Sequence, residues 1–428
     1  MSEPLRLGIA GLGTVGRGVV KIVQEKAGLL AARAGRPVEI SAVCARDPGR
    51  DRGVGLSAYA WETDPVALAT RADVDVFVEL MGGSEGAPLD ATRAALEAGK
   101  DVVTANKAMM ALHGQELAEL ADRTGGCLRY EAGVAGAIPA IKALTEALAA
   151  NGIERVLGVM NGTCNYILTR MQSAGLSYDE VFAEAAKLGY LEADPTLDVG
   201  GIDAGHKLAI LAAIAFGAKV NFGGVHLEGI ERITIEDINR AADMGYRVKL
   251  LGVAQMTGRG LEQRMTPCLV PANSPLGQLE NATNMVVIEG DASGRIVLQG
   301  AGAGEGPTAS AVMSDVMDIA RGLRLPTFGQ PAANLVDLPP AVSATPAPYY
   351  LRFILDDKPG ALAKIATILG NNGISIDRMR QYGHAESKAP VLIVTHRTTR
   401  ADLDAALSQM PATGVLAGEP VAIRIERL

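Results

Sequence analysis

Short apolar runs alternate with helix-like segments along the first third of the chain. The runs at residues 5–10, 38–43, 74–79 and 101–104 have the length and composition of buried strands. Residues 17–23 and 91–98 have apolar positions at helical spacing. Strands that alternate with helices in this way predict a doubly wound parallel sheet of the α/β class.

The middle of the chain has a different pattern. Strands are predicted at residues 156–160, 247–253 and 294–297, and helices at 140–150, from Asn161 onward and at 309–321. The run at residues 208–216 is apolar nearly all round, which indicates a buried helix. Helices and strands that do not alternate regularly are typical of an α+β domain.

The last part of the chain reads as a separate module. Residues 336–348 are rich in proline and alanine, which predicts a linker. Beyond it, strands and helices follow in the order βαββαβ, which predicts a ferredoxin-like plan. The strands are expected at 349–355, 374–379, 390–395 and 421–425, and the helices at 361–371 and 401–409.

The composition narrows the class of protein. A length of 428 residues allows two or three domains, and 21% charged with 48% hydrophobic residues is typical of a globular chain. The net charge of −8 disfavours nucleic acid as a partner. Scattered cysteines and histidines predict neither disulfides nor a zinc site, which fits a reducing cytoplasm. The chain leads directly into a strand and has no long apolar run, so neither a signal peptide nor a membrane partner is expected.

A glycine-rich turn follows the first predicted strand. Gly11, Gly13 and Gly16 form the pattern G-x-G-x-x-G, with Thr14 and Val15 at the start of the next helix. The first glycine permits a tight turn, the second lets the backbone approach a pyrophosphate, and the third lets the helix pack on the strand. The helix N-terminus then faces the phosphates. The turn therefore predicts a Rossmann-type dinucleotide-binding domain.

The end of the second strand carries the residues that distinguish the two nicotinamide cofactors. An acid at this point binds the ribose 2′-hydroxyl of NAD, whereas an arginine accommodates the 2′-phosphate of NADP. Arg46 therefore favours NADP(H) as the cofactor. The adjacent Asp47 is an acid at the same strand end, so NAD(H) is also possible. The alternative for Arg46 is an exposed turn residue.

Another strand end also carries polar residues. Thr104 ends a predicted strand and Lys107 follows it, at the edge where doubly wound sheets bind ligands. A lysine that begins a helix is usually a surface residue, but this position favours a functional role for Lys107.

The stretch from Asp198 to Lys207 carries the most informative polar residues. Asp203 and Lys207 are four residues apart, so on a helix they share one face. Because the helix that follows is buried, Lys207 is held near the interior, where proton transfer becomes feasible. The simpler alternative is an acid at a helix start with a solvated ion pair.

Two later glycine-rich turns each precede a helix. Residues 131–138 could hold a hard cation through carbonyl oxygens or could be a plain connection. Residues 300–308 include Gly304 and lead to a helix N-terminus that could receive an anion or a cofactor. Asn161 either caps its helix or touches a ligand, and Cys164 is either reactive or a small packing residue.

These motifs occur in order along nearly the whole chain, and together they resemble the long bacterial form of homoserine dehydrogenase. That family interconverts L-homoserine and L-aspartate 4-semialdehyde with NAD(P)(H), in the biosynthesis of threonine, methionine and isoleucine. The matching motifs are Gly11-Leu-Gly-Thr-Val-Gly16, Thr104-Ala-Asn-Lys107, Asn161-Gly-Thr163, Glu192-Ala-Asp-Pro-Thr196, Asp203 to Lys207, Gly302-Ala-Gly304 and Pro307-Thr-Ala-Ser310.

The resemblance implies a role for each matching residue. Lys207 corresponds to the proton-donating lysine of the family, and Asp203, with Asp198 nearby, to its substrate-binding acids. Glu192 corresponds to the acid that holds the substrate's amino group, and Lys107 to a lysine near the cofactor and the reacting oxygen. A cationic lysine both stabilises a developing alkoxide and supplies its proton.

The resemblance also implies binding sites for a cofactor and a monovalent cation, Na⁺ or K⁺. The cation loop is expected to bind mainly through backbone oxygens. One departure is Gly200, where many members of the family carry glutamate. The expected cofactor-binding residues are Gly11, Gly13, Thr14, Val15, Gly16, Arg46, Thr104, Lys107, Gly189 and Gly304, and the cation-binding residues are Glu131, Val134, Gly136 and Ile138.

The expected domains follow from the same resemblance. Residues 1–133 form the dinucleotide-binding domain, completed by part of 305–335; residues 134–320 form the catalytic and dimerisation domain, and 336–348 the linker. Residues 349–428 resemble an ACT domain through the motif D-x-P-G-x-L at Asp357 to Leu362. This module implies feedback inhibition by L-threonine and a homodimer or homotetramer. A purely dimerising or vestigial module is the alternative.

Three other functions compete with this interpretation. A related amino-acid dehydrogenase with another substrate is disfavoured by Glu192, Asp203 and Lys207 together. A non-catalytic, nucleotide-bound amino-acid sensor is disfavoured because the acids and Lys207 are all present. A fusion to a kinase is not expected, since the chain begins directly with the dinucleotide fold.

Overall fold

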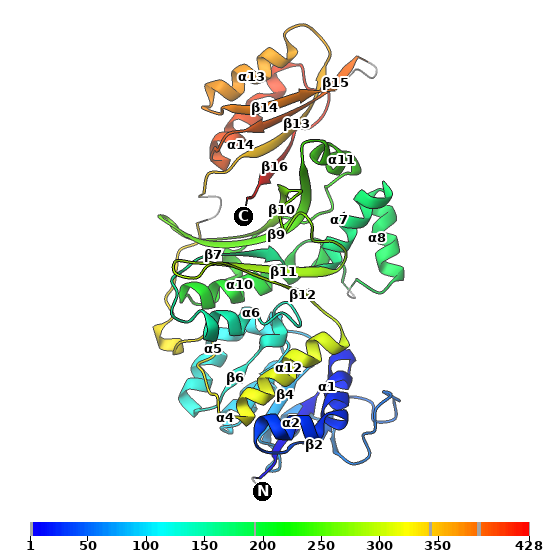
Figure 1. The fold of residues 1–428 in the computed structure, drawn as a ribbon, viewed down its shortest axis with the longest axis vertical. Helices are drawn as coiled ribbons and strands as arrows, with labels where there is room; N and C mark the ends of the chain where they lie inside the picture. Colours follow the sequence, from blue (N-terminus) through cyan, green and yellow to red (C-terminus); the bar gives the residue numbers. More distant parts are fainter. Residues whose placement is uncertain (1–2, 192–193, 342–344, 383–386, 428) are drawn as a thin grey trace.

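The fold was analysed in a computed structural model, which describes residues 3–191, 194–341, 345–382 and 387–427. The molecule is elongated, with the N-terminal domain at one end, the middle domain at its centre and the C-terminal module at the other end (Figure 1). Among the described residues, no helix combines the length and the apolar character needed to cross a membrane.

The N-terminal domain is a parallel sheet in the order β3-β2-β1-β4-β5-β6. Its central strands are apolar on both faces, as expected when helices cover both sides, and Leu7, Ile9 and Phe77 are fully buried. The prediction of a doubly wound sheet is confirmed. The strands are β1 (Leu5–Ala10), β2 (Val38–Cys44), β3 (Ala60–Glu62), β4 (Val76–Glu79), β5 (Asp101–Thr104) and β6 (Leu128–Arg129). The helices are α1 (Thr14–Glu25), α2 (Ala27–Ala34), α3 (Pro65–Thr70), α4 (Ala87–Glu97) and α5 (Lys107–Thr124).

A helix from much later in the sequence returns to this domain. α12 (Glu305–Ala320) packs against α1 (Figure 1), and its apolar residues share a core with β1 and β2. α12 begins four residues before the predicted start at 309. The glycines and Pro307 read as a loop, but Pro307 lies in the first turn, where a helix needs no backbone N–H donor.

The middle domain is built on a sheet in the order β12-β11-β7-β9-β10. Its strands are β7 (Ile153–Val159), β9 (Tyr246–Thr257), β10 (Gly260–Pro271), β11 (Thr283–Gly290) and β12 (Gly294–Ala301), and the short β8 (His226–Leu227) pairs with β10. Its helices are α6 (Ala140–Lys142), which continues as a π-turn over Ala143–Ala147, α7 (Gly162–Ala174), α8 (Tyr178–Lys187), α9 (Thr196–Val199), α10 (Ile202–Phe216) and α11 (Ile235–Asp243). Short 3₁₀ turns lie at Glu131–Gly133, Phe222–Gly224 and Ala332–Asn334.

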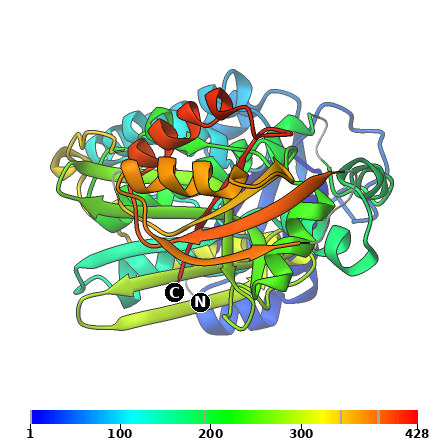
Figure 2. The same ribbon diagram turned by 90° about the horizontal axis from the view of Figure 1, so that it is seen from above.

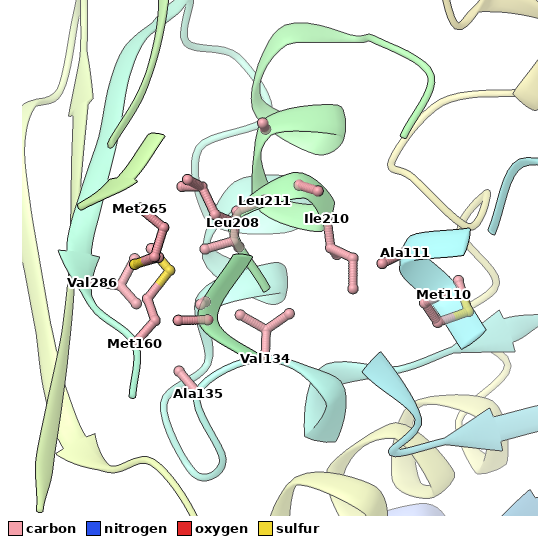
Figure 3. Close-up of a cluster of buried hydrophobic side chains, with 14 of the residues drawn as sticks. Met110, Ala111, Val134, Ala135, Met160, Leu208, Ile210, Leu211, Met265 and Val286 are labelled. Carbon is pink, nitrogen blue, oxygen red and sulfur yellow. The ribbon is translucent and has the colours of Figure 1, made fainter. Parts of the chain in front are cut away.

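The apolar helix α10 joins the two domains. Leu208 lies toward Met160, just after β7, and Met265 of β10, whereas Ile210 lies toward Ala111 of α5 (Figure 3). All five side chains are at most 4% exposed. The sequence pattern that is apolar all round therefore reflects contacts on opposite sides of the helix, and the polar first turn of α10 is held where the domains meet.

The C-terminal module has the predicted βαββαβ order and a strand order of β16-β13-β15-β14. Both of its long helices lie on the same side of its strands (Figure 2). The elements are β13 (Tyr349–Asp356), α13 (Ala361–Asn371), β14 (Ile376–Gln381), β15 (Lys388–Thr395), α14 (Arg400–Gln409), a 3₁₀ turn at Pro411–Thr413 and β16 (Val421–Ile425).

This module is less separate than the sequence suggested. β16 pairs in parallel with β10, so its strands continue the sheet of the middle domain. The open edge of β16 supplies the unpaired backbone groups that allow this. The predicted linker is also held in place: Leu261 of β10 donates a hydrogen bond to the carbonyl of Pro339 (3.0 Å) and accepts one from Ala341 (2.9 Å).

Candidate functional site

Two adjoining cavities lie at the carboxyl edge of the N-terminal sheet. The outer cavity, of about 890 Å³, is lined by the glycine-rich turn and the segment after β2. The inner cavity, of about 830 Å³, lies between that turn, the start of α10 and the loop before α12. Thr14, Leu80 and Met81 line both. Cavities of this size and position are typical of a cofactor and a small substrate bound side by side.

The glycine-rich turn has the geometry needed for a pyrophosphate. Gly11 has a φ of 96°, and a Cβ there would lie 2.4 Å from the carbonyl oxygen of Leu80. A Cβ at Gly16 would lie 2.0 Å from the carbonyl oxygen of Gly11, so Gly16 permits the close packing of α1. Gly13 precedes α1 and has open space where a side chain would be. The backbone is therefore accessible at the positive end of α1, which fits a dinucleotide.

The far end of the outer cavity is rich in arginine. Arg46 is exposed and lines it, together with Arg50; Arg17, near the start of α1, also lines the cavity but is paired with Glu305 at 3.3 Å. Asp47 also lines the cavity, but its Oδ1 atom accepts a hydrogen bond from the backbone N–H of Gly49 at 2.9 Å. Positive charge therefore predominates where the second ribose of a dinucleotide is expected.

A buried hydrogen-bond network joins the ends of β4 and β5. The hydroxyl of Thr104 donates to Oε2 of Glu79 at 2.6 Å, and the backbone N–H of Met81 donates to Oε1 at 2.7 Å. Burial raises the pKa of Glu79 to about 7, although these hydrogen bonds lower it. Asn106 donates its N–H to the Thr104 hydroxyl (2.9 Å) and caps α5. Thr104 is fully buried and lines neither cavity, so its part in cofactor binding stays a prediction.

Two lysines from distant parts of the chain meet at Asp203. Lys107 Nζ, at the start of α5, lies 2.8 Å from Asp203 Oδ1. Lys207 Nζ, one turn along α10, lies 2.7 Å from Asp203 Oδ2 and donates to the carbonyl of Met160 at 2.9 Å. Asp203 and Lys207 are buried, whereas 31% of the Lys107 side chain is exposed. All three ionic side chains line the inner cavity.

The lysines determine the charge of Asp203. Burial alone would raise the pKa of Asp203, but the ammonium groups of Lys207 and Lys107 outweigh burial and hold that pKa well below its usual range. Asp203 is therefore a carboxylate at neutral pH. The result is a negative charge between two positive ones, beside a space for a polar substrate.

Asp198 completes the acidic side of the inner cavity. It lies in α9, is buried, and accepts a hydrogen bond from Asn161 Nδ2 at 3.0 Å. Gly189 and Tyr190 also line the cavity, and Thr163 donates to the carbonyl of Tyr190 at 2.9 Å. The predicted substrate acid Glu192 lies outside the described residues.

The predicted cation loop folds against α12 and α6. The Glu131 carboxylate accepts hydrogen bonds from the backbone N–H groups of Ile141 (3.0 Å) and Lys142 (2.8 Å), so it caps α6. Val134 and Ile138 are buried, and Gly136 has a positive φ of 57° and lines the inner cavity. Among the described residues, no three His, Cys, Asp or Glu side chains are grouped closely enough to hold a metal ion. A cation bound by backbone oxygens is a different arrangement, and it stays a prediction.

The structure bears on the alternatives for Asn161 and Cys164. Asn161 caps α7, so that interpretation is confirmed; it also contacts both acids and lines the inner cavity, and its contact with a ligand stays a prediction. Cys164 is fully buried, burial raises its thiol pKa well above the usual value, and its thiol donates to the carbonyl of Asp198 at 3.3 Å. Cys164 is therefore a packing residue. Gly304 precedes α12 and lines the inner cavity.

Three residues outside the expected catalytic, substrate, cofactor and cation residues belong to the lining or support of the site. Asn161 and Thr163 lie in a matching motif after β7, and Glu79 is the last residue of β4, so their position near a strand end was the available signal. The pairing of Asn161 with two acids on other elements depends on tertiary structure, so no local pattern indicated it.

A third cavity, of about 450 Å³, lies in the C-terminal module. It is formed by the turn between β13 and α13, with Asp357, Gly360 and Ala366 in its lining, and by β14 through Gln381. Its mixture of backbone, apolar and polar groups suits a small amphiphilic ligand.

Comparison with protein-family models assigns most of the chain. Residues 139–317 match the model described as homoserine dehydrogenase, and residues 11–131 match the homoserine dehydrogenase NAD-binding domain. Residues 349–410 match the ACT domain. The three matches correspond to the three parts of the fold described above.

Individual relatives agree with the family models. The chain is 41% identical to homoserine dehydrogenases of Neisseria gonorrhoeae and Pseudomonas aeruginosa, and each match covers all of this chain and at least 99% of the relative. A crystal structure of a homoserine dehydrogenase from Thiobacillus denitrificans superposes with a TM-score of 0.93 at 39% identity, covering 99% of this chain and 98% of that one. A hyperthermophilic archaeal homoserine dehydrogenase in complex with NADPH is 27% identical, with a TM-score of 0.63, and the match covers 74% of this chain and 97% of that one.

Proposed function

Because the chain belongs to the homoserine dehydrogenase family, we propose that it interconverts L-homoserine and L-aspartate 4-semialdehyde with a nicotinamide cofactor. One observation carries this proposal: Asp203 lies between Lys107 and Lys207 at the inner cavity, next to the cavity expected to hold the dinucleotide. The cofactor, when bound, supplies or accepts the hydride.

Lys207 is the proposed acid and base. In the reducing direction, its Nζ ammonium donates a proton to the carbonyl oxygen as that oxygen gains negative charge. In the oxidising direction, the neutral amine accepts the hydroxyl proton. Met160 and Asp203 hold Nζ in place through the two contacts described above, and Lys107 polarises the same oxygen from the more open side.

The acids bind the amino end of the substrate. Asp198, Asp203 and Glu192 are the proposed partners of its ammonium group. Asp198 and Asp203 line the inner cavity from α9 and α10, which supports their part in this proposal. A substrate held at its ammonium would have its other end free to reach Lys207.

NADP(H) is the preferred cofactor in this proposal, with NAD(H) as the weaker alternative. Arg46 and Arg50 at the outer cavity suit a 2′-phosphate, and the structure of the archaeal homoserine dehydrogenase was solved in complex with NADPH. Gly11, Gly13, Thr14, Val15 and Gly16 would hold the pyrophosphate, while Gly189 and Gly304, which line the inner cavity, would lie at the nicotinamide end.

A monovalent cation, Na⁺ or K⁺, is proposed at the loop containing Val134 and Gly136. The carboxylate of Glu131 is already bonded to two backbone N–H groups. Glu131 and Ile138 would therefore contribute backbone oxygens. The cation would fix the loop that forms one wall of the inner cavity.

L-Threonine is the proposed effector of the C-terminal module. The module matches the ACT domain, and its cavity follows β13 at the residues of the D-x-P-G-x-L motif. A carboxylate at this turn would lie near the start of α13, whose N-cap residue Gly360 has no side-chain cap and whose helix dipole favours negative charge. β16 then offers a direct connection to the middle domain.

The remaining proposals concern the cellular location, the pathway and the oligomeric state of the enzyme. It acts in the cytoplasm, in the biosynthesis of threonine, methionine and isoleucine. It forms a homodimer or homotetramer, and the edge strand β12, with its exposed Val297, is a suitable surface for another copy.

The test is the change in nicotinamide absorbance with purified full-length protein. NADPH should be consumed on addition of aspartate semialdehyde, NADH more slowly, and L-threonine should slow both reactions. A folded protein that binds NADPH but shows no substrate-dependent consumption would contradict the proposed activity and favour a nucleotide-bound amino-acid sensor.

A further inference from the structure

Asn161 connects the two acids of the inner cavity. It follows β7 and is 3% exposed. Its Nδ2 amide donates to Asp198 Oδ1 at 3.0 Å and to Asp203 Oδ2 at 3.3 Å. Its Oδ1 atom accepts the backbone N–H of Cys164 at 2.8 Å, which caps α7. The two ends of one amide therefore bond to different partners, and the helix cap fixes which end faces the acids.

The same short segment also holds the lysine. Met160 precedes Asn161 and accepts a hydrogen bond from Lys207 Nζ at 2.9 Å. Asp203 Oδ2 then contacts both Lys207 Nζ (2.7 Å) and Asn161 Nδ2 (3.3 Å). The end of β7 thus fixes Lys207 through a carbonyl and its carboxylate partner through an amide.

The amide of Asn161 is a neutral donor placed between two acids that lie on different helices, α9 and α10. It therefore holds the Asp198 side chain in a fixed position relative to Asp203 and to the ion pair that Asp203 forms with Lys207. The titratable groups around Asn161 are Asp198, Asp203, Lys207, Lys107, His206 and the Cys164 thiol.

We infer that Asn161 is a positioning residue of the active site, which holds the side chains of Asp198 and Asp203 in a fixed arrangement and thereby sets the orientation of Lys207. The inference rests on the proposed function for the chemistry that Lys207 performs. Asn161 would contribute to catalysis indirectly, through its contacts with the two acids and their contact with Lys207.

Two substitutions separate this role from the capping role. Asp, Asn and Ser are comparable helix caps, so Asn161→Asp and Asn161→Ser both retain an acceptor for the Cys164 N–H. Asn161→Asp replaces the donor with a carboxylate that faces two others. Asn161→Ser removes the amide N–H₂ group that bonds to both acids, leaves a shorter hydroxyl in its place and adds no charge.

The experiment measures the pH dependence of kcat/KM for homoserine oxidation, with nucleotide affinity from NADPH fluorescence and thermal stability as further readouts. Asn161→Ser should lower kcat/KM roughly ten- to hundredfold, the value of a hydrogen bond to a charged group, with its pH profile unshifted. Asn161→Asp should lower it further and move the rising limb up by roughly one pH unit or more, because added negative charge raises the pKa of Lys207. NADPH affinity should stay at the wild-type value in both.

A matched control is available at another asparagine cap. Asn221 accepts the backbone N–H of Gly224 through Oδ1 at 2.9 Å and does not line the inner cavity. Asn221→Asp makes the same chemical change and should leave both kcat/KM and the pH profile unchanged.

Several results would overturn the inference. Wild-type kcat/KM in both variants would do so, since capping alone would then explain the residue. Equal losses in both variants with unshifted pH profiles would also do so, since the effect would then be independent of the charge placed beside the two acids. Failure of Asn161→Asp to fold would leave Asn161→Ser as the deciding variant. A wild-type protein without homoserine-dependent activity would contradict the proposed function instead, so the two failures are distinguishable.

Discussion

Replacement of Lys207 by methionine removes the proposed acid and base with little change in side-chain length. The substitution deletes the ammonium contacts to Asp203 Oδ2 (2.7 Å) and to the carbonyl of Met160 (2.9 Å). The aliphatic part of the side chain keeps its place on α10, whose neighbouring residues are buried. The change therefore tests chemistry more than packing.

The size of the expected effect follows from these contacts. Loss of a general acid or base typically lowers kcat by about 10²- to 10⁴-fold, and that range is expected here. Breaking a buried ion pair usually costs about 3–5 kcal/mol. Asp203 would retain Lys107 and Asn161 as partners, so we expect a smaller loss of unfolding free energy, of about 1–3 kcal/mol.

A second buried lysine provides the matched control. Lys249 is 4% exposed, donates to Asn165 Oδ1 at 2.8 Å and to the carbonyl of Leu279, and does not line the inner cavity. Lys249→Met should reduce thermal stability and leave kcat close to the wild-type value. The assay is steady-state reduction of aspartate semialdehyde, with circular dichroism to establish folding.

The result that would refute this reasoning is a folded Lys207→Met protein with kcat within about tenfold of wild type, below the usual contribution of an acid or base. An equal loss of kcat in Lys249→Met would also refute it, because the effect would then follow from burying methionine in place of lysine. A large loss confined to Lys207→Met agrees with the proposed role.

Three further predictions concern other parts of the molecule. Burial raises the pKa of Glu79 from 4.5 to about 7, so folding favours its protonated form. The unfolding free energy should therefore fall as pH rises between those values, by up to about 1.4 kcal/mol per pH unit. Denaturant titrations at several pH values should show a smaller dependence of unfolding free energy on pH for Glu79→Gln, and an identical dependence would contradict this. Arg46→Ser should raise KM for NADP⁺ roughly ten- to hundredfold and leave KM for NAD⁺ unchanged, whereas equal changes would exclude a 2′-phosphate contact. Ala366→Trp should fill the cavity of the C-terminal module and abolish inhibition by L-threonine with kcat unchanged; retained inhibition would place the effector elsewhere.

Threonine inhibition is better tested by this point substitution than by removal of the module. β16 pairs with β10, and Arg264 of β10 is bonded to Glu426 just beyond β16. Both side chains are buried. Deleting residues 349–428 would expose the edge of β10 and leave Arg264 without this partner, so lost activity would not report on regulation.

The sequence was sufficient for the parts of the fold that local patterns determine. The alternation of strands and helices predicted the doubly wound sheet, and the βαββαβ order of the C-terminal module agrees with the structure. Predicted α13 and β16 coincide with the observed elements. Each of these rests on hydrophobic periodicity within a few residues.

Contacts between distant segments were not predictable in this way. The joining of β16 to β10 and the pairing of the linker with Leu261 depend on which strand edges lie open after folding. The start of α12 was placed too late because glycine and proline favour loops, although a proline is tolerated in a first helical turn.

In the candidate site, too, contacts within one element could be predicted from the sequence and contacts between distant elements could not. Asp203 and Lys207 are linked by helical spacing, so their contact could be predicted locally. Lys107 reaches Asp203 from another domain, and its place beside a strand end gave only a general expectation. The double contact of Asn161 requires three separate elements to converge, which a single sequence does not reveal.

The most direct test of the central claim is a crystal structure of the full-length protein with NADP⁺ and L-homoserine. The account predicts that the substrate hydroxyl lies within hydrogen-bond reach of Lys207 Nζ, at about 2.6–3.2 Å, with the ammonium group on the side of Asp198 and the nicotinamide in the adjoining cavity. A hydroxyl that contacts Lys107 alone, with Lys207 still bound to Asp203 and Met160 and directed away from the substrate, would contradict the assignment of Lys207 as the acid and base.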